Sequence, residues 1–395
     1  MRVLIVHNLY QNPGGEDAVF AAETELLRTR GHHVIHHTVD NAAISGMMAV
    51  GVGLRTVWNP RAYRDLREVM RRARPDVAHF HNTLPLISPA AYYAASACRV
   101  PVVQTVHNYR LGCPNGLCFR DNRACTDCAG RVVPWPGMLH KCYRNSRVAT
   151  TAVAAMLSLH RLARTWSRRV DLYIAPTEFA RRMLIAFGID AEKIVVKPHF
   201  VDPDPGLGEV RRSGYGLFVG RLSPEKGVST LIEAWRRIGH EIPLRIVGDG
   251  PLAPAAAAKE LPGISWLGRQ SSSEVARLLR EADFLLFPSA TFETFGRVIV
   301  EAFAAGTPVI AAGHGAAAEL VRDGHCGLHF RPHDASDLVD KVTVLASNPA
   351  LRRQLSMAAR AEFESRYTAD ANYHALTSIY RRVVERQLTS ARVDR

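Results

Sequence analysis

The sequence of 395 residues has no apolar run long enough to cross a membrane. A membrane-spanning helix needs about 18 consecutive apolar residues, and the nearest approach, residues 44–57, is interrupted by Ser45, several glycines and Arg55. The opening residues MRVLIV are followed at once by polar His7 and Asn8, which leaves no apolar segment of the length that a secretion signal requires. We therefore expect a cytoplasmic protein without an integral membrane segment.

Acidic residues are also in short supply. The chain has 37 Asp and Glu against 50 Lys and Arg, a formal net charge of +13. Such an excess of positive charge favours a polyanionic partner. The partner can be a phosphate-bearing small molecule, a nucleic acid or an anionic membrane surface. The cations do not gather in one block with interleaved aromatic residues, the pattern typical of nucleic-acid binding. Nucleic acid is therefore the least favoured of the three partners.

Cysteine is rare outside one segment, because five of the seven cysteines lie in a Gly-, Pro- and Arg-rich insertion at about residues 110–146. In a cytosolic chain such a cluster points to metal or to thiols before disulfides. One CxxC pair with further thiols can form a tetrahedral zinc site, which would order a segment so poor in apolar residues. We predict a structural zinc, with thiols or a disulfide and an iron–sulfur site as the alternatives. The expected ligands are Cys113, Cys125, Cys128 and Cys142, with Cys118 as an alternative ligand.

Short β-branched apolar runs alternate with longer amphipathic stretches, the pattern of a parallel sheet with crossover helices. The first series of expected strands comprises residues 2–6, 34–38, 77–80, 100–106 and 172–175. A turn-rich segment around residues 203–208 follows, and a second series begins after it. Its strands are residues 215–219, 244–247, 264–267, 284–287 and 308–311.

This alternation predicts an α/β protein with two similar parallel-sheet domains in tandem. We expect an N-terminal domain over residues 1–203 and a C-terminal domain over residues 204–370. From Asn348 on there is no strand candidate, and the pattern predicts two helices. The last helix, residues 371–395, is expected to pack back towards the N-terminal domain.

In such sheets, ligands bind at the carboxyl ends of the strands, near the reversal of strand order. After the first expected strand, Gly14 and Gly15 open a helix, and paired glycines let backbone N–H groups approach a phosphate at a helix N-terminus. The simpler alternative is a tight strand-to-helix turn. His79 and His81 lie two residues apart on another strand, and we interpret them as core or site-lining residues because no third metal ligand is evident.

A second glycine-bracketed loop, residues 220–227, directly follows the first strand of the second series. Its Arg221 and Lys226 combine a forked guanidinium with an ammonium, which can hold a diphosphate and neutralise its charge. The alternative is a pair of solvated cations on a loop. Because the loop lies at a strand end, phosphate binding and solvated cations are equally favoured interpretations.

The most informative segment is residues 288–310, where a strand, a loop, a helix and another strand follow one another. Glu293 lies in the loop, and Glu301 lies on the second turn of the helix among apolar neighbours. Each carboxylate can accept hydrogen bonds from neighbouring hydroxyl groups of a ligand. An anion would meet the helix N-terminus at the backbone amides of Thr294, Phe295 and Gly296.

These motifs together resemble the family 4 retaining glycosyltransferases of the GT-B fold, over essentially the whole chain. The resemblance is carried by the PS…ETFG…EAFAAGTPVIA run with Glu293 and Glu301 separated by seven residues, by GR…EKG at 220–227 and by VGDGP at 247–251. A Cys-bearing insertion occurs in a subset of the family. The resemblance implies two Rossmann-like, doubly wound domains facing a central cleft, with the C-terminal helices crossing back.

The resemblance also implies roles for single residues. Arg221 and Lys226 would hold the donor diphosphate, Glu301 the ribose hydroxyls, and Glu293 the hydroxyls of the transferred sugar. His107, at the end of a strand, matches a histidine that reaches the donor sugar from the N-terminal domain. The remaining expected donor contacts are the phosphate loop at Gly14 and Gly15, Gly220, the helix start at residues 294–296, and base contacts near Gly250 and Arg269.

The implied activity is that of a hexosyltransferase, which transfers a hexose from a UDP or GDP sugar to a hydroxyl acceptor with retention at the anomeric carbon. No catalytic metal is required, and no residue stands out as an activated nucleophile, which fits front-face attack in which the departing phosphate takes the acceptor proton. The alternatives are a nucleotide-sugar epimerase or hydrolase on the same fold and a non-enzymatic nucleic-acid binder. The chain departs from the common Asn-Gly-Val-Asp pattern at residues 198–202, which read PHFVD.

The expected acceptor is a saccharide or a lipid-linked saccharide of cell-envelope polysaccharide synthesis. Arginine-rich residues 55–74 and 161–182 belong to the N-terminal domain, and apolar residues 47–54 precede the first of them. We expect peripheral docking on anionic lipid at the inner face of the cytoplasmic membrane. A solvated basic face is the alternative, and the oligomeric state is left open.

Overall fold

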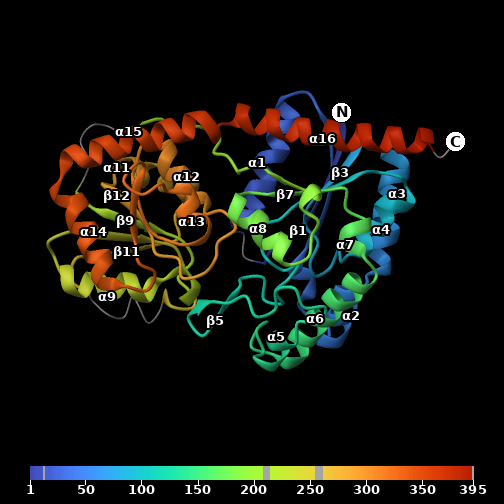
Figure 1. Cartoon of the computed structure of the whole chain (residues 1–395), viewed down its shortest axis with the longest axis horizontal. Coiled ribbons are helices and arrows are strands. Elements are labelled where there is room, and N and C mark those ends of the chain that lie inside the picture. The colour runs from blue at the N-terminus through green and yellow to red at the C-terminus, as the bar shows by residue number, and fades with distance from the viewer. Residues whose placement is uncertain (12–13, 208–213, 254–260, 394–395) are drawn as a thin grey trace. The chain divides into compact units, whose positions relative to one another are not determined.

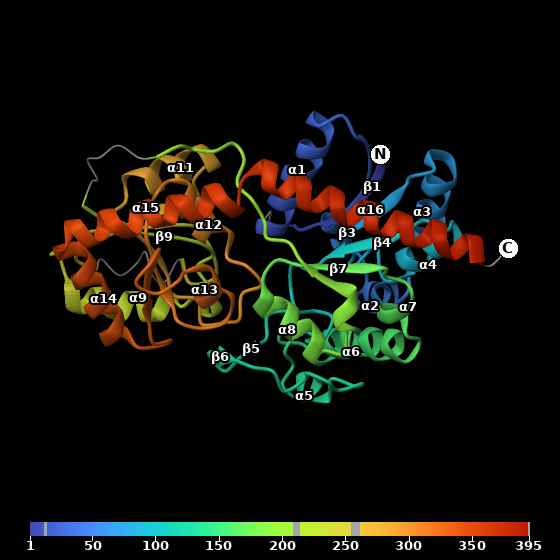
Figure 2. The ribbon, with the colours of Figure 1, turned by 45° about the horizontal axis from the view of Figure 1, so that its top comes forward.

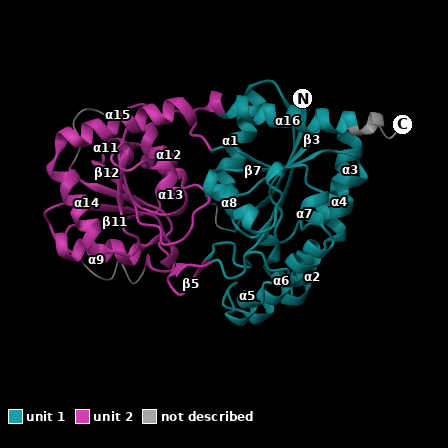
Figure 3. Cartoon of the chain, in the orientation of Figure 1, with its two compact units in different colours: residues 1–118, 126–198, 372–395 teal, residues 119–125, 199–371 magenta. Residues whose placement is uncertain are grey.

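The computed structural model describes residues 1–11, 14–207, 214–253 and 261–393. The chain forms two compact units, and each has its own six-stranded sheet (Figure 3). Unit 1 comprises residues 1–118, 126–198 and 372–395, and unit 2 comprises residues 119–125 and 199–371. The last segment of the chain is therefore part of the unit that begins it.

The sheet of unit 1 has the strand order β2-β1-β3-β4-β7-β8, and all neighbouring strands are parallel. Its strands are β1 (Arg2–Leu9), β2 (His33–Asp40), β3 (Val77–Asn82), β4 (Val102–Thr105), β7 (Leu172–Ala175) and β8 (Ile194–Val196). The five strands expected in this part of the chain are confirmed, and β8 is an additional short edge strand. Strand order reverses between β1 and β3, which makes their carboxyl ends the natural ligand position.

Helices cover both faces of this sheet (Figures 1 and 2). The helices of unit 1 are α1 (Gly15–Thr29), α2 (Ala49–Val57), α3 (Pro60–Ala73), α4 (Ala90–Ala97), α5 (Trp135–Leu139), α6 (Arg147–Leu162), α7 (Thr165–Arg168), α8 (Glu178–Ala186) and α16 (Ala369–Val393), with short 3-10 helices at Asn41–Ile44 and Ala191–Lys193. The hairpin β5 (Phe119–Arg120) and β6 (Arg123–Ala124) was not expected from the sequence. Phe20 and Leu27 of α1 and Leu376 and Tyr380 of α16 share one core cluster with β1, so α16 is an integral part of unit 1.

The sheet of unit 2 has the order β11-β10-β9-β12-β13-β14, again wholly parallel. Its strands are β9 (Gly216–Val219), β10 (Leu244–Val247), β11 (Ile264–Gly268), β12 (Phe284–Phe287), β13 (Val309–Ala312) and β14 (Gly327–Phe330). Its helices are the 3-10 helix η3 (Pro224–Lys226), α9 (Val228–Ile238), α11 (Ser272–Glu281), α12 (Arg297–Ala304), α13 (Gly315–Leu320), α14 (Ala335–Ser347) and α15 (Pro349–Arg366). The reversal of strand order lies between β9 and β12.

Successive strand residues of unit 2 point to opposite faces of the sheet, and each face has its own core. Leu217 and Leu285 pack with residues of α11, α12 and α15, whereas Phe218 and Leu286 pack with α9 and α14. Strands that are buried on both faces read as continuous apolar runs, which is why their positions were predictable. The α/β class with two doubly wound parallel sheets is confirmed. Within the described ranges, no helix combines the length and the apolar character that crossing a bilayer requires.

Candidate functional site

The loop after β9 in unit 2 runs along the carboxyl edge of the sheet and is fixed by backbone contacts. The Gly220 amide donates to Val247 O at 3.0 Å, and the Leu222 amide donates to Asp249 O at 2.9 Å. Gly227 ends η3 with φ +71°, and a Cβ there would lie 1.8 Å from the Pro288 carbonyl oxygen. Only glycine fits this approach, which brings the β9 loop against the loop after β12.

Lys226 and Glu293 meet where these two loops approach each other. Lys226 Nζ lies 2.6 Å from Glu293 Oε1, with the two side chains 30% and 17% exposed. Ser289 Oγ lies 2.7 Å from the same carboxylate oxygen. An ammonium has three N–H donors, so Lys226 can serve a ligand oxygen in addition to Glu293.

His314, which follows β13, supports this arrangement from the neighbouring strand. Its Nε2 lies 2.8 Å from the Ser289 carbonyl oxygen. Burial lowers the pKa of His314, so the ring is neutral at pH 7 and donates one N–H there. Neither Ser289 nor His314 was singled out from the sequence, although both stand just after a strand.

Glu301 lies on the second turn of α12, as the sequence predicts. Arg297 Nε lies 3.1 Å from its Oε1, and a quarter of the carboxylate side chain is exposed. Burial raises the pKa of Glu301, and the nearby Arg297 opposes the rise. Gly296 is the N-cap of α12 with φ +101°, which sets the direction in which the helix leaves the loop.

The other expected donor contacts in unit 2 differ in exposure. Arg221 and Arg269 are exposed, after β9 and β11 respectively, and Gly250 follows β10 at the same edge. Thr294 and Gly296 are partly buried, and the side chain of Phe295 is 3% exposed. The Phe295 ring packs edge-on against His199 of the PHFVD turn, with 4.9 Å between centroids. Phe295 therefore contributes its side chain to the core.

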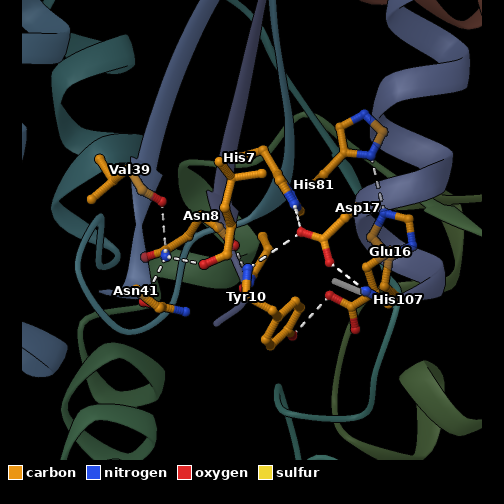
Figure 4. A network of polar contacts seen from close by, with 12 residues as sticks. His7, Asn8, Tyr10, Glu16, Asp17, Val39, Asn41, His81 and His107 are labelled. Atoms are coloured by element: carbon orange, nitrogen blue, oxygen red, sulfur yellow. Dashed lines mark hydrogen bonds and ion pairs between the residues drawn. The ribbon is translucent and has the colours of Figure 1, made fainter. Parts of the chain in front are cut away.

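In unit 1, polar side chains gather where β1, β3 and β4 end (Figure 4). His107 Nε2 lies 3.0 Å from His81 Nδ1, and His7 Nε2 lies 2.9 Å from Asp17 Oδ1. Burial lowers the pKa of His107 to about 3, and neighbouring histidines and Lys197 add to this effect. His107 is therefore neutral at pH 7.

The Gly14–Gly15 turn opens α1 at this edge, but the Gly14 amide is already used. It donates to Asp17 Oδ2 at 2.8 Å, in a capping arrangement. Burial favours a higher pKa for Asp17, but hydrogen bonds from His7, Gly14 and Tyr10 outweigh it and lower the pKa. A phosphate at this turn would have to compete with an ionised carboxylate for the Gly14 amide.

Glu16 is a second carboxylate of this turn. Tyr10 Oη donates to its Oε2 at 2.9 Å, and Asn108 Nδ2 donates to its Oε1 at 3.0 Å. Burial raises the pKa of Glu16, although these hydrogen bonds oppose the rise. A pocket opens beside it, lined among others by His81, His107, Asn108, Arg110 and Trp166.

Behind His107 lies a fully buried ionic cluster. Lys197 Nζ lies 2.6 Å from Glu23 Oε1, and both side chains are wholly inaccessible to solvent. Glu23, His79 and His81 each offer a ligand atom within 4.8 Å of the others. The expectation that no third ligand stands near the two histidines is therefore wrong, because α1 supplies Glu23. The ammonium of Lys197 already provides the positive charge that this carboxylate needs, so we do not assign a metal to the cluster.

The cysteines of the insertion differ in burial and in their hydrogen-bond partners. Cys113 Sγ lies 2.9 Å from Asn115 Oδ1, and Cys118 and Cys128 are buried. A hydrogen bond from the Cys118 thiol, together with backbone amides, outweighs burial and lowers the pKa of Cys113 to about 6. Within the described ranges, Glu23, His79 and His81 are the one group of three side chains whose possible metal ligands lie close together. None of the cysteines belongs to this group.

Two sequence families match this chain in tandem. The family described as Glycosyltransferase Family 4 matches residues 14–205, and Glycosyl transferases group 1 matches residues 207–362. A phosphatidyl-myo-inositol mannosyltransferase of Mycobacterium tuberculosis is 27% identical over 379 residues, 88% of each chain. An uncharacterized glycosyltransferase of Methanocaldococcus jannaschii is 35% identical over 170 residues, and this match spans 47% of that relative.

Solved structures share the fold at low sequence identity. Anabaena HepE in complex with UDP and glucose has a TM-score of 0.69 at 18% identity, covering 96% of this chain and 99% of that one. Sucrose-phosphate synthase from Thermosynechococcus elongatus has a TM-score of 0.71 at 17% identity, covering 99% and 100%. Two doubly wound sheets, the edge loops of unit 2 and the tandem family matches agree, and the chain belongs to the family 4 glycosyltransferases of the GT-B fold.

Proposed function

We propose that this glycosyltransferase moves a hexose from a nucleoside diphosphate sugar to a hydroxyl acceptor, with retention at the anomeric carbon. The observation that carries the proposal is the contact between Lys226 and Glu293 at the carboxyl edge of the unit 2 sheet. It joins a cation suited to a diphosphate with a carboxylate suited to sugar hydroxyls. Glu301, on the helix that follows, would accept hydrogen bonds from the ribose.

In the proposed reaction, the acceptor oxygen bonds to the anomeric carbon as the bond to the diphosphate oxygen breaks. The departing phosphate oxygen takes the acceptor proton on the same face of the sugar, which preserves the configuration. Negative charge grows on the diphosphate during this step, and Arg221, Lys226 and the N-terminus of α12 would stabilise it. His107 would contact the donor sugar from unit 1.

The donor is proposed to be a UDP or GDP sugar, and we expect catalysis without a required metal. The UDP bound to a structural neighbour supports the nucleotide class. Incubation with donor alone separates transfer from the rival activities. A transferase leaves most of the donor unchanged until an acceptor is added, whereas rapid epimerisation or hydrolysis without acceptor would assign the protein to a rival class.

We further propose that the acceptor is a saccharide or lipid-linked saccharide met at an anionic membrane surface. The mycobacterial relative, a phosphatidyl-myo-inositol mannosyltransferase by name, supports a lipid-borne acceptor. Residues 41–64 and 128–170 contain eleven Lys and Arg and no Asp or Glu. Helices α2 and α6, which pack together, lie within these residues.

These helices expose apolar side chains on their outer sides. Exposed fractions are 67% for Leu54 of α2 and 52% for Leu159 of α6. We call the following set the α2/α6 surface: Met48, Val50, Leu54, Val148, Leu159 and Leu162, all more than half exposed. Exposed apolar side chains on chain segments that carry eleven cations and no acidic residue suit the interface of an anionic bilayer.

Vesicle co-sedimentation tests this docking. The protein should bind vesicles that contain phosphatidylglycerol in preference to phosphatidylcholine vesicles. The double variant Leu54→Glu/Leu159→Glu should lower the partition coefficient at least about tenfold, since it removes two side chains worth about 1.5–3 kcal/mol each when buried. Met357→Glu, which alters an equally exposed position on α15, is the matched control. Equal binding to both vesicle types would refute the docking.

The structural zinc remains part of the proposal, with ligands among the insertion cysteines. The lowered pKa of Cys113 supports it, because the thiolate is the form that binds zinc. Metal analysis of protein purified without chelators should find close to one zinc per chain, and Cys128→Ser should lower this whereas Cys98→Ser should not. Less than about 0.3 zinc per chain would refute the site.

A further inference from the structure

One carboxylate oxygen of Glu23 is buried without a hydrogen bond, and the proposed reaction assigns it no role. Its Oε1 pairs with Lys197, but its Oε2 is buried without a hydrogen-bond partner. The nearest ring nitrogen is His81 Nε2, at 3.6 Å, which is also buried without a partner. Two unsatisfied polar atoms thus face each other beneath the unit 1 pocket.

His79, the other ring near this carboxylate, is already satisfied. Its Nδ1 lies 2.7 Å from Tyr380 Oη and its Nε2 lies 2.7 Å from Thr105 Oγ1. His79 Nδ1 is 4.0 Å from Glu23 Oε2, beyond hydrogen-bond distance. His81 is therefore the ring on which the carboxylate acts.

His81 is neutral, because burial lowers its pKa well below the usual value and the neighbouring histidines add to this. A neutral imidazole carries one N–H and one acceptor nitrogen. The proton of His81 stands either on Nδ1, which faces His107, or on Nε2, which faces Glu23. The two choices have different consequences for His107.

With the proton on Nδ1, His81 would donate to His107 and turn its Nε2 lone pair towards an ionised carboxylate in a dry interior. With the proton on Nε2, His81 presents an N–H to that carboxylate, and its Nδ1 becomes an acceptor. Like-signed partial charges 3.6 Å apart and shielded from water are costly. The carboxylate of Glu23 therefore selects the Nε2–H form of His81.

The tautomer of His81 in turn determines the tautomer of His107. Because His81 Nδ1 accepts, His107 Nε2 must carry its proton to form the 3.0 Å hydrogen bond. We propose that Glu23 and His81 are positioning residues that hold His107 protonated on Nε2, so that its Nδ1 accepts a hydrogen bond from a substrate hydroxyl. Only the identity of the substrate rests on the proposed function.

The tautomer can be read directly in the full-length protein. Histidine labelled with 15N gives long-range 1H–15N spectra that distinguish a protonated ring nitrogen from a bare one. At neutral pH, His81 and His107 should both carry the proton on Nε2, with His81→Gln and His107→Gln used for assignment. A proton on Nδ1 of His107 in the wild-type protein would overturn the proposal, whether or not sugar transfer is detected.

The variant Glu23→Gln/Lys197→Met tests the cause, because it removes the ion pair without leaving a lone buried charge. His107 should then lose its preference for Nε2–H, and kcat should fall about tenfold or more while the donor KM stays within about threefold. An unchanged His107 tautomer in this variant would show that Glu23 does not select it. His240→Gln, an exposed histidine of unit 2, is the control and should change neither quantity.

A third comparison separates orientation from packing. In His81→Gln the amide oxygen can still accept from His107 Nε2–H, whereas in His81→Leu no acceptor remains. We expect the glutamine variant to retain at least about tenfold more activity than the leucine variant at equal thermal stability. Equal losses in both variants would overturn the positioning role of His81.

Discussion

At the scale of single residues, Glu293 stands out because two groups from different loops contact its carboxylate, and a third group holds one of them. Lys226 lies after β9, Ser289 follows β12, and His314 holds the Ser289 carbonyl from β13. Glu293 is thus held in place before any ligand arrives, and a fixed carboxylate loses little entropy on binding a hydroxyl. The same contact keeps the Lys226 ammonium at the strand edge.

Replacement of either partner should therefore impair transfer strongly. Glu293→Ala and Lys226→Ala are each expected to lower kcat/KM at least about a hundredfold, on the order of 2.7 kcal/mol. Steady-state kinetics with a nucleotide-sugar donor measure this. Glu233→Ala and Lys341→Ala, which change an exposed and a partly exposed residue of the same unit, should stay near wild type. Near-normal transfer by Glu293→Ala or Lys226→Ala would rule out the assigned role.

The buried histidines of unit 1 predict an acid sensitivity. Burial lowers the pKa of His79 to about 4 and that of His107 to about 3, and it lowers that of His81 well below its usual value. Unfolded histidine titrates near pH 6.5, so below that pH the unfolded chain binds protons that the folded chain does not. Stability is therefore complete above about pH 6.5 and falls as the pH drops towards the folded values.

Urea unfolding between about pH 8 and about pH 5 checks this, with up to about 1.4 kcal/mol lost per pH unit for each such histidine. His79→Gln should show a shallower slope whatever its absolute stability, because it removes one of the titrating groups. His240→Gln should keep the wild-type slope, since His240 is exposed. Equal slopes in all three proteins would exclude the buried histidines as the cause.

At the scale of elements, the turn from η3 into α9 fixes the distance between two loops. Gly227 has φ +71°, and a Cβ there would lie 1.8 Å from Pro288 O. Gly324 of the same unit has a similar φ of +70° with no atom within 4 Å of such a Cβ. The two glycines therefore have nearly the same φ and differ in the clash.

Gly227→Ala should destabilise unit 2 by about 1–3 kcal/mol more than Gly324→Ala. It should also lower kcat/KM, because moving Pro288 shifts Ser289 and with it Glu293. Denaturant unfolding and kinetics on both variants provide the comparison. If Gly324→Ala costs as much as Gly227→Ala, the close approach of the loops is not what requires glycine.

The strands also show which elements could be predicted from the sequence pattern and which could not. Apolar runs buried on both faces, such as β7 and β12, were placed correctly because nothing but a sheet interior accommodates them. The edge strands β8 and β14 were missed. The first has only three residues, and the second reads GLHF, in which only Leu328 and Phe330 are large apolar residues. Glu293 and Lys226 carried family motifs, whereas Glu23 and Lys197 lie 174 residues apart and become neighbours only through the fold.

At the scale of the whole molecule, the chain consists of two compact units that carry different groups of candidate functional residues. Unit 1 holds the histidine network and the cationic α2 and α6 segments, and the expected donor contacts lie mostly in unit 2. Chains with more than one core need not unfold in a single step. A ligand that binds one unit stabilises that unit by mass action.

Calorimetry of the full chain should therefore separate the two units when a nucleoside diphosphate is added. At a free concentration one hundred times Kd, the ligand contributes about 2.7 kcal/mol, which shifts the unfolding of a unit of this size by about 5–10 °C. UDP, GDP, ADP and dTDP tested in parallel identify the base. Lys226→Ala should lose most of the shift, whereas Lys341→Ala should keep it. A shift that persists in Lys226→Ala would place the diphosphate elsewhere, because an ammonium that neutralises its charge cannot be removed without loss of affinity.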